Sequence, residues 1–318
     1  MYSKNEWDKL KKVVVGIADN ATIPELEVSL RTVNYANVVD TSTIPVGPYP
    51  QTVIDEANED LDVFCNVLRS NGVEVVRPTV GPVNYYNYCP RDSVIVYKDT
   101  AIAAPMSLKC RDKEYLSFAH HLDNVNYISN YIKDDIYNLD CVNNSDILAL
   151  HNFKPKFDAA NVIRANDDLL YLVSNSGNKS GADVLKEEFN ANVHLLENVY
   201  SYMHIDSTVT FLREGLMLLN PSRIKTIDVM PGPFKDWDYI MCPEPVDIGH
   251  YPGYCNSSAW INVNLFSINP NLVVLEEHQH NLRKELEKHN IECIMLPMRH
   301  ARTLGGCFHC VTLDLVRE

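Results

Sequence analysis

The stretch DSVIVYKDTAIAAP at residues 92–105 has the pattern of a β-strand, a polar turn and a second strand. Apolar and β-branched residues fill both halves, and Lys98-Asp99 separates them. Three further hairpins of this kind follow: ANVIRANDDLLYLVS (160–174), STVTFLREGLMLLN (207–220) and AWINVNLFSINPNLVVLEE (259–277). The chain begins with a strand-like segment, KKVVVGIAD (11–19), and ends with another, GCFHCVTLDLV (306–316). If these two pair, they close the series of hairpins into a ring.

Helical segments alternate with the hairpins. Three segments carry apolar residues at helical spacing: VIDEANEDLDVFCNVLRSNG (53–72), KSGADVLKEEFNA (179–191) and EEHQHNLRKELEKHNI (276–291). A short strand follows each one: VEVVRP (73–78), NVHLLE (192–197) and IECIMLP (291–297). The recurring unit is hairpin, helix and strand, which predicts an α/β fold of about five modules around an axis. No low-complexity segment or Gly/Ser linker divides the chain, so we expect residues 1–318 to form a single domain.

The charge balance restricts the partners. The chain has 318 residues, with 28 Lys and Arg against 42 Asp and Glu, for a formal net charge of −14. This surplus repels phosphate backbones and anionic membranes, so we expect neither nucleic acid nor a membrane as partner, whereas a small cationic substrate is easier to accommodate. No secretory signal or membrane-spanning run is recognisable, which favours the cytoplasm. The nine scattered cysteines indicate thiols rather than disulfides.

Polar residues stand directly before each hairpin and before the final strand. In chain order they are Asp92, Asp158, His204 with Asp206, Ser257 with Ser258, and the segment GGCFHC (305–310). Each has an ordinary explanation when taken singly, because Asp is common in turns and caps and a lone His is usually structural. If the modules are equivalent, however, these groups occupy equivalent places and converge near the axis. That pattern predicts an active site assembled from separate strand ends.

Cys307 and Cys310 are open to several interpretations. A zinc site needs a second ligand pair, and Cys242 and Cys255 do not supply one at suitable spacing. A redox dithiol is expected near the start of a helix, whereas this pair lies in a strand-like run. Two half-buried structural cysteines remain an alternative, since free Cys is commonly buried. In a strand, alternation would place Cys307 and His309 on one face and Cys310 on the other.

Three carboxylates, an imidazole and a thiol at one site indicate a narrow chemistry. Clustered carboxylates collect a cation, and a planar guanidinium meets carboxylates in bidentate pairs. A thiolate beside that cation faces an electrophilic carbon. An imidazole can protonate the departing amine and later deprotonate the next nucleophile. The residues therefore predict covalent cleavage of a C–N bond in a guanidino compound.

Several motifs occur in a fixed order along nearly the whole chain. They are NEWDKLKKVVVG (5–16), PRDSVIV (90–96), APM (104–106), FDAANVIRA (157–165), MHIDST (203–208), NPSR (220–223), SSAWINVN (257–264) and LGGCFHC (304–310). In these motifs the chain resembles the amidinotransferases, the arginine–glycine and arginine–inosamine-phosphate enzymes of the pentein superfamily. The resemblance implies a five-bladed α/β propeller with a pseudo-fivefold axis, in agreement with the five modules, and it implies neither a cofactor nor a metal.

The resemblance also implies roles at the reacting centre. Cys310 is the nucleophile, because the family's cysteine follows the Gly-rich stretch and the Phe-His pair. His204 is the general acid and base, and Asp158 lies beside this imidazole and the guanidinium. Asp92 and Asp206 bind the amidino group.

Further residues are implied for the rest of the substrates. Arg223 and Ser258 bind the α-carboxylate of the donor. Ser201 and Met203 precede the catalytic His in the loop that shapes the acceptor pocket, and serine differs from the asparagine usual in the glycine enzymes. Cys307 stands where the family usually has a third glycine.

The implied activity is transfer of the amidino group from L-arginine to glycine or another primary amine through an amidino-cysteine, with release of L-ornithine. One alternative is a deiminase of the same superfamily, in which water replaces the amine and citrulline forms. Another is a non-catalytic arginine-binding homologue, although a pure binder would not need the thiol. The sequence identifies neither the acceptor nor the oligomeric state, for which a homodimer is an open alternative.

Overall fold

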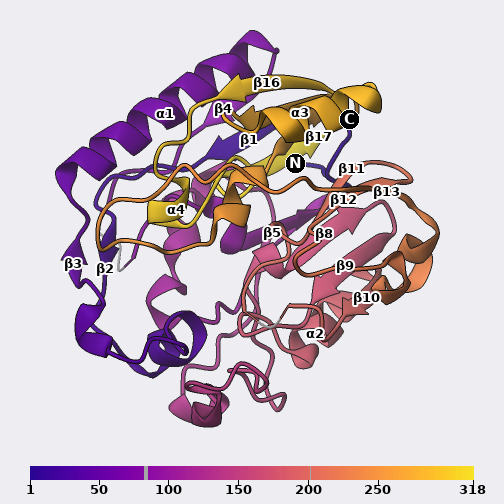
Figure 1. Ribbon diagram of the computed structural model, residues 1–318. Helices are drawn as coiled ribbons and strands as arrows, with labels where there is room; N and C mark the ends of the chain where they lie inside the picture. Colours follow the sequence, from indigo (N-terminus) through magenta and orange to yellow (C-terminus); the bar gives the residue numbers. More distant parts are fainter. Residues whose placement is uncertain (82–84, 201) are drawn as a thin grey trace.

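The computed structural model describes residues 1–81, 85–200 and 202–318, and its elements form the α/β fold that the sequence predicts (Figure 1). Within these ranges the strands form five three-stranded sheets and one two-stranded sheet. In each three-stranded sheet, the middle strand runs antiparallel to one neighbour and parallel to the other. One arrangement of strands is therefore repeated along the chain.

Each larger sheet consists of a hairpin and a third strand, except that the two ends of the chain supply the pair in one of them. In spatial order, the five larger sheets are β17 (Thr312–Arg317), β1 (Leu10–Val15) and β4 (Glu74–Val76); β5 (Val94–Tyr97), β6 (Thr100–Ala103) and β7 (Val125–Tyr127); β8 (Val162–Ala165), β9 (Asp168–Leu172) and β10 (Asn192–Leu196); β11 (Val209–Arg213), β12 (Leu216–Leu219) and β13 (Asp238–Met241); and β14 (Phe266–Asn269), β15 (Leu272–Glu276) and β16 (Glu292–Leu296). The small sheet pairs β2 (Thr22–Ile23) with β3 (Gly47–Pro48).

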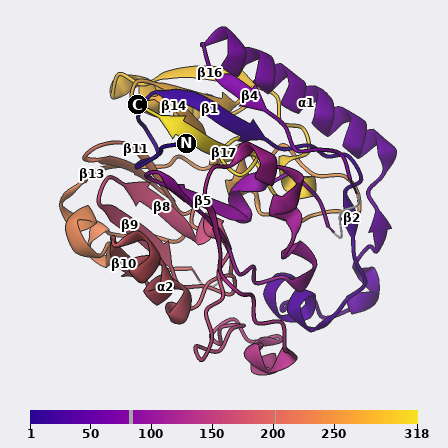
Figure 2. The same ribbon diagram turned by 180° about the vertical axis from the view of Figure 1, so that it is seen from behind.

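All four predicted hairpins are confirmed, as the antiparallel pairs β5–β6, β8–β9, β11–β12 and β14–β15. Short turns connect the first two pairs, with Lys98 and Asn166 at φ of 52° and 61°. The pairing of the terminal strands is confirmed as well, because β1 runs antiparallel to β17 with Val13 opposite Asp314. Figure 2 shows the two ends of the chain close together beside these strands.

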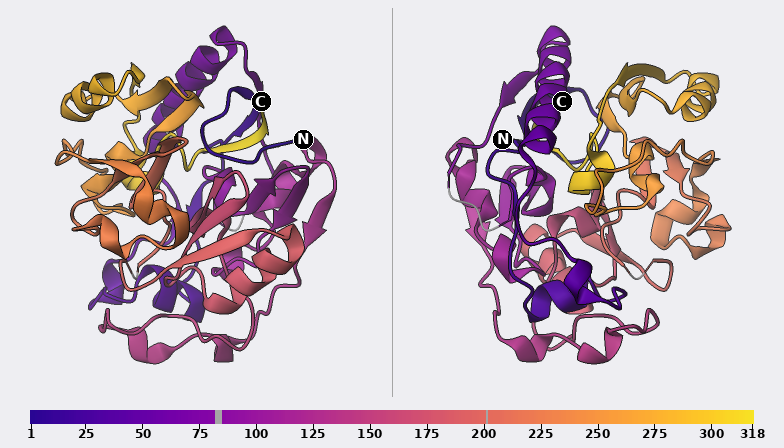
Figure 3. Two further views of the ribbon diagram at one scale, coloured as in Figure 1. Left: turned by 90° about the vertical axis from the view of Figure 1, so that its right-hand side faces the viewer. Right: turned by 60° about the vertical axis from the view of Figure 1, so that its left-hand side comes forward.

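The three predicted helices are also confirmed. They are α1 (Gln51–Ser70), α2 (Lys179–Phe189) and α3 (His280–Lys288), which precede β4, β10 and β16. Each is amphipathic, and α1 buries Leu61, Phe64 and Leu68 on one face. Figure 3 shows the three helices at the outside of the molecule. Before β7 and β13 the chain forms only short 3-10 helices, such as η4 (Lys109–Arg111) and η10 (Ile227–Val229).

The apolar core lies between neighbouring sheets. Buried side chains of β17 and β5 share one cluster, those of β6 and β9 a second, those of β8 and β11 a third, those of β12 and β15 a fourth, and those of β14 and β1 a fifth. Each fully buried Val, Leu or Ile side chain contributes about 1.5–3 kcal/mol to such a core. Each three-stranded sheet therefore packs against the next, and the last packs against the first.

A buried network of ion pairs joins segments that are distant in the sequence. Asp314 of β17 accepts hydrogen bonds from Arg91 and Arg164, each at 2.5 Å, and from Arg317 at 2.8 Å. Glu6 accepts from Arg164 Nε at 2.8 Å. Because each buried charge needs its partner, loss of one member would leave another unpaired, which typically costs about 3–5 kcal/mol. The network holds the segments that carry the polar motifs in place.

The final strand begins later than predicted. Residues 306–311 are not part of β17, which starts only at Thr312. The short helix α4 (Ala301–Leu304) ends at Gly305, whose φ of 78° is in the left-handed region, and Val311 N then donates to Cys307 O at 3.0 Å. The expected alternation of Cys307 and Cys310 across a strand is therefore wrong, because a turn places them. Similarly, residues 259–263 form a 3-10 helix, η12 (Ala259–Val263), before β14 begins at Phe266.

Neither a membrane span nor a metal cluster occurs among the described residues. No helix of these ranges has both the length and the apolar character to cross a membrane. No group of three or more His, Cys, Asp or Glu side chains in the same ranges is arranged to hold a metal ion. All nine cysteines are free thiols.

Candidate active site

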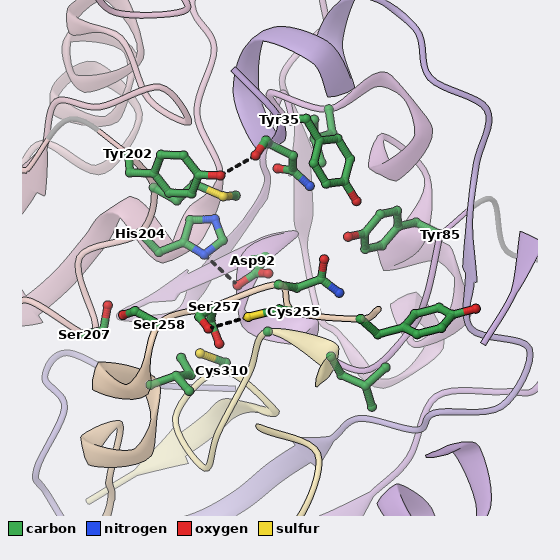
Figure 4. A pocket seen from close by; sticks show the side chains of 18 of the residues that line it. Tyr35, Tyr85, Asp92, Tyr202, His204, Ser207, Cys255, Ser257, Ser258 and Cys310 are labelled. Carbon is green, nitrogen blue, oxygen red and sulfur yellow. Dashed lines mark hydrogen bonds and ion pairs between the residues drawn. The ribbon is translucent and has the colours of Figure 1, made fainter. Parts of the chain in front are cut away.

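Most of the predicted site residues meet at one cavity of about 600 Å³ (Figure 4). Those on its lining are Asp92, Met203, His204, Asp206, Arg223, Ser258 and Cys310. Asp158 is fully buried behind the lining, and Ser201 lies outside the described residues. Cavities of roughly 300–1,000 Å³ are typical of sites for small molecules. Residues far apart in the sequence thus converge on a space of suitable size for a substrate.

Apart from Arg223, which follows β12, these polar groups stand on turns directly before the first strand of a sheet or on the 3-10 helix of such a turn. Asp92 ends η3 (Pro90–Asp92) before β5, and Asp158 is the N-cap of η9 (Ala159–Asn161) before β8. His204 and Asp206 precede β11, where Thr208 N donates to Ile205 O at 2.7 Å. Both residues lie in this turn rather than in the strand, and both line the cavity.

The imidazole of His204 lies between two carboxylates. Its Nε2 is 2.9 Å from Asp158 Oδ2, and its Nδ1 is 3.7 Å from Asp92 Oδ1. Asp158 is fixed in turn, because its Oδ1 accepts hydrogen bonds from Ser107 N at 2.8 Å and Ser107 Oγ at 2.9 Å. Burial alone would lower the pKa of His204, but Asp92, Asp158 and Asp206 outweigh it and raise the pKa to about 9. The ring is therefore protonated at neutral pH and can act as an acid.

Asp92 is oriented by two residues that the sequence analysis missed. Arg111 Nη1 donates to Asp92 Oδ2 at 2.8 Å, and Arg111 Nε donates to Glu114 Oε2 at 2.8 Å. The other oxygen, Asp92 Oδ1, is buried and has no hydrogen-bond partner among the described residues. One oxygen of the carboxylate is thus held by Arg111, and the other, 3.7 Å from His204 Nδ1, can still accept a hydrogen bond from a guanidinium. No motif singles out Arg111 or Glu114, since both lie in the irregular segment after β6.

The thiol of Cys310 is enclosed and hydrogen-bonded. The residue is 3% exposed, and its Sγ lies 3.1 Å from Asp206 Oδ2 and 3.4 Å from Asn264 Oδ1. Its backbone N also donates to Asn264 Oδ1, at 3.1 Å. Asn264 lies in the motif SSAWINVN, and no role was predicted for it. Cys307 is fully buried and does not line the cavity.

The resting thiol of Cys310 is neutral. A hydrogen bond with the Cys89 thiol, burial, and the negative charge of Asp206 together raise the pKa of Cys310 well above its usual range. Burial would also raise the pKa of Asp206, but a 3.0 Å hydrogen bond with His309 Nδ1 outweighs it and lowers that pKa. Asp206 therefore stays charged beside the sulfur. A guanidinium bound next to Cys310 and Asp206 would favour the thiolate, because opposite charge lowers a thiol pKa.

A further guanidinium lies elsewhere on the lining. The guanidinium of Arg223 stacks 3.5 Å from the ring centre of Tyr200, and its Nη1 donates to Ser207 Oγ at 2.8 Å and Thr208 Oγ1 at 2.6 Å. No carboxylate among the described residues forms an ion pair with it within 4.0 Å. Ser258, the N-cap of η12, lines the same cavity. Arg223 is therefore available to bind an anionic group such as a carboxylate.

Three known proteins that are similar to the chain are named amidinotransferases. No model of a known protein family matches the chain. It is 38% identical to inosamine-phosphate amidinotransferase 1 of Streptomyces glaucescens, over 98% of this chain and 95% of that protein. It is 29% identical to L-arginine:L-lysine amidinotransferase of Pseudomonas savastanoi pv. phaseolicola, over 99% of this chain and 94% of that protein. The solved structure of an inosamine-phosphate amidinotransferase from Streptomyces griseus matches with a TM-score of 0.94 at 36% identity, covering 99% of this chain and 96% of that one.

Proposed function

The chain belongs to the amidinotransferase family, and we propose that it moves the amidino group of L-arginine to an amine acceptor through a covalent intermediate on Cys310. The observation that carries this proposal is the arrangement around the thiol. The carboxylate of Asp206 contacts the sulfur, and the unpartnered oxygen of Asp92 and the protonated ring of His204 belong to the same cavity. These groups match the charge and hydrogen-bonding needs of a guanidinium.

In the first half-reaction, the guanidinium of arginine binds to Asp92 and Asp206, and its charge lowers the pKa of the Cys310 thiol, whose proton leaves to solvent before the thiolate attacks. The sulfur attacks the central carbon of the guanidinium, and the bond from this carbon to the side-chain nitrogen breaks. His204 gives its proton to that nitrogen, and ornithine leaves. Asp158 stabilises the imidazolium through the 2.9 Å hydrogen bond. Arg223 and Ser258 hold the α-carboxylate of the donor.

In the second half-reaction, the acceptor takes the place of ornithine. His204, now neutral, removes a proton from the acceptor amine, which attacks the amidino carbon and releases the Cys310 thiolate. His204 thus acts first as an acid and then as a base, and Cys310 first as nucleophile and then as leaving group. No cofactor is needed for these steps. Met203 lines the cavity next to His204 and contributes to the acceptor wall. The named acceptors of the two relatives, inosamine phosphate and lysine, differ from each other, so family membership does not identify the acceptor here.

A hydrolase would use the same thiol, imidazole and carboxylates, with water in place of the amine. Water is far more concentrated than any amine, so transfer requires a cavity that positions the acceptor and limits water at the sulfur. The 3% exposure of Cys310 supports such shielding. The names of both relatives also favour transfer over hydrolysis.

We also propose that the five three-stranded sheets are the blades of a propeller formed by a single domain of residues 1–318. The closed order in which the sheets pack against one another supports this arrangement. The site residues before β5, β8, β11, β14 and β17 would then face a common axis. A cytoplasmic location is proposed from the sequence alone.

The test is incubation with labelled arginine, with and without a panel of amines, followed by mass-spectrometric identification of the products. We expect ornithine and an amidino-acceptor when the right amine is present, and only slow formation of citrulline without it. The reverse reaction, from the amidino product and ornithine, should regenerate arginine. Rapid citrulline formation that no amine changes would identify a hydrolase and refute the transferase.

A further inference from the structure

The segment between β2 and β3 contributes uncharged hydrogen-bonding groups to the cavity. Asn34 Oδ1 and Tyr35 Oη are shielded from solvent, and neither has a hydrogen-bond partner among the described residues. Both residues line the cavity. Asn34 is the last residue of η1 (Leu30–Asn34), a π-helical turn of a type that is frequent at functional sites, and Tyr35 is its C-cap. Buried polar atoms without a partner are costly unless a ligand supplies the missing bond.

Tyrosines extend this wall. Tyr85, Tyr202 and Tyr254 also line the cavity, and the hydroxyl of Tyr202 donates to the backbone oxygen of Asn34. In Figure 4, Tyr35, Tyr85 and Tyr202 lie on the side away from Cys310, with His204 and Asp92 between them and the sulfur. Burial raises the pKa of Tyr35 to about 12, so its hydroxyl stays a neutral donor. Such a wall suits a carbon ring that carries hydroxyl groups.

Positive charge that could hold a phosphate is scarce on the lining. Two guanidinium groups line the cavity, those of Arg111 and Arg223, and no lysine of the described ranges does. Arg111 is already paired with Asp92 and Glu114. Arg223 alone can balance about one negative charge, whereas a phosphate monoester carries about 1.5 to 2 at neutral pH. The excess charge would be enclosed with Asp92 and Asp206, which repel it.

The volume of the cavity also argues for a bulky acceptor. About 600 Å³ falls within the range that encloses ring-containing ligands, and glycine would leave much of it unfilled. A small acceptor would also leave Asn34 and Tyr35 without hydrogen bonds. Both the size and the chemistry of the wall therefore favour a larger, uncharged molecule around the reacting amine.

We propose that the acceptor is a hydroxylated ring amine, such as an amino sugar or an aminocyclitol, that carries no phosphate group. This inference rests on the proposed transferase function and concerns the same cavity. The hydroxyls bind Tyr35 and Asn34, and the amine faces Cys310. The amine nitrogen forms a bond to the amidino carbon, the bond from this carbon to sulfur breaks, and the sulfur keeps the electron pair. The proton lost by the amine goes to His204.

The test compares acceptors that differ only in the phosphate group. Inosamine is paired with inosamine phosphate, and glucosamine with glucosamine 6-phosphate, with glycine and lysine as small acceptors. The protein is first exposed to arginine, and ornithine is measured before each amine is added. In at least one pair, we expect kcat/KM for the phosphate-free amine to exceed that of its phosphate ester by roughly a hundredfold. It should also exceed the values for glycine and lysine.

A variant locates the bound hydroxyls. Tyr35→Phe removes one hydroxyl and should lower kcat/KM for the preferred hydroxylated amine by about tenfold, the effect of one lost hydrogen bond. For cyclohexylamine, which has no hydroxyl, the same substitution should lower kcat/KM much less. Tyr239→Phe is the matched control, because Tyr239 is 42% exposed on β13 and does not line the cavity. It should react like the unmodified protein.

The outcomes separate the inference from the function on which it rests. Equal or better reaction of the phosphate esters, or a preference for glycine or lysine, would overturn the inference and leave the transferase intact. Ornithine release without transfer to any hydroxylated amine would overturn it as well, while preserving the first half-reaction. Absence of ornithine would refute the proposed function itself, and the inference with it.

Discussion

Replacement of Asp158 by Asn tests how the site controls the charge of His204. Asp158 Oδ2 lies 2.9 Å from His204 Nε2; Asp158 is fully buried, whereas the His204 side chain is 14% exposed. A hydrogen bond to a charged group is worth about 1.5–3 kcal/mol, and a change of one in pKa corresponds to about 1.4 kcal/mol. The substitution should therefore lower the pKa of His204 by about one to two. Asp92 and Asp206 remain, so part of the upward shift persists.

The assay is the rate of ornithine release in a single turnover, measured from pH 6 to about 10. Protonated His204 must donate to the leaving nitrogen, so this rate is full below the pKa of His204 and is lost as the pH rises through it. The midpoint of the fall in rate should lie near pH 9 in the unmodified protein and at about pH 7 to 8 in Asp158→Asn. Asp168→Asn is the matched control, because Asp168 pairs with His194 at 2.7 Å outside the cavity. An unmoved decline in Asp158→Asn would refute the role of His204 as the acid.

Three further substitutions test other parts of the site. Cys307→Gly should keep most of the ornithine-releasing activity, because Cys307 does not line the cavity and its backbone is not in the positive-φ region that favours glycine. Loss of activity in a variant that still folds would contradict this prediction. Arg111→Lys should raise KM for arginine by about tenfold or more, since a lysine cannot hold both Asp92 and Glu114 with a planar fork, and an unchanged KM would count against this positioning. Agmatine is arginine without the α-carboxylate. Arg223→Gln should reduce the ratio of kcat/KM for arginine to kcat/KM for agmatine by about a hundredfold. An unchanged ratio would exclude Arg223 as the carboxylate site.

The regular elements could be predicted from the sequence because their patterns are local. Alternating apolar runs on both sides of Lys98-Asp99 define a hairpin, and helical spacing across residues 53–72 defines α1. The starts of the strands could not be predicted in the same way. Residues 306–311 are as apolar as a strand, but a strand also needs a partner for its backbone, and the hydrogen bond from Val311 N to Cys307 O forms a turn instead.

The site could be predicted only in part. The position of polar residues before each hairpin was enough to bring Asp92, His204, Asp206 and Cys310 to one cavity. The residues that orient them were missed, because their roles depend on irregular segments. Arg111 reaches Asp92 from the loop after β6, and nothing in its sequence neighbourhood signals that contact. The groups on residues 34 and 35 were missed for the same reason, since they lie at the end of η1, a single π-helical turn of five residues.

The central claim is that Cys310 carries the amidino group between donor and acceptor. Its most direct measurement is intact-mass and peptide analysis of the protein after exposure to arginine without any amine. We expect one added amidino group per chain, located on Cys310, together with an equal amount of ornithine. Subsequent addition of a competent amine should remove the group, and Cys310→Ala should form no adduct. An amidino group on another residue, or ornithine release by Cys310→Ala at the normal rate, would contradict the account.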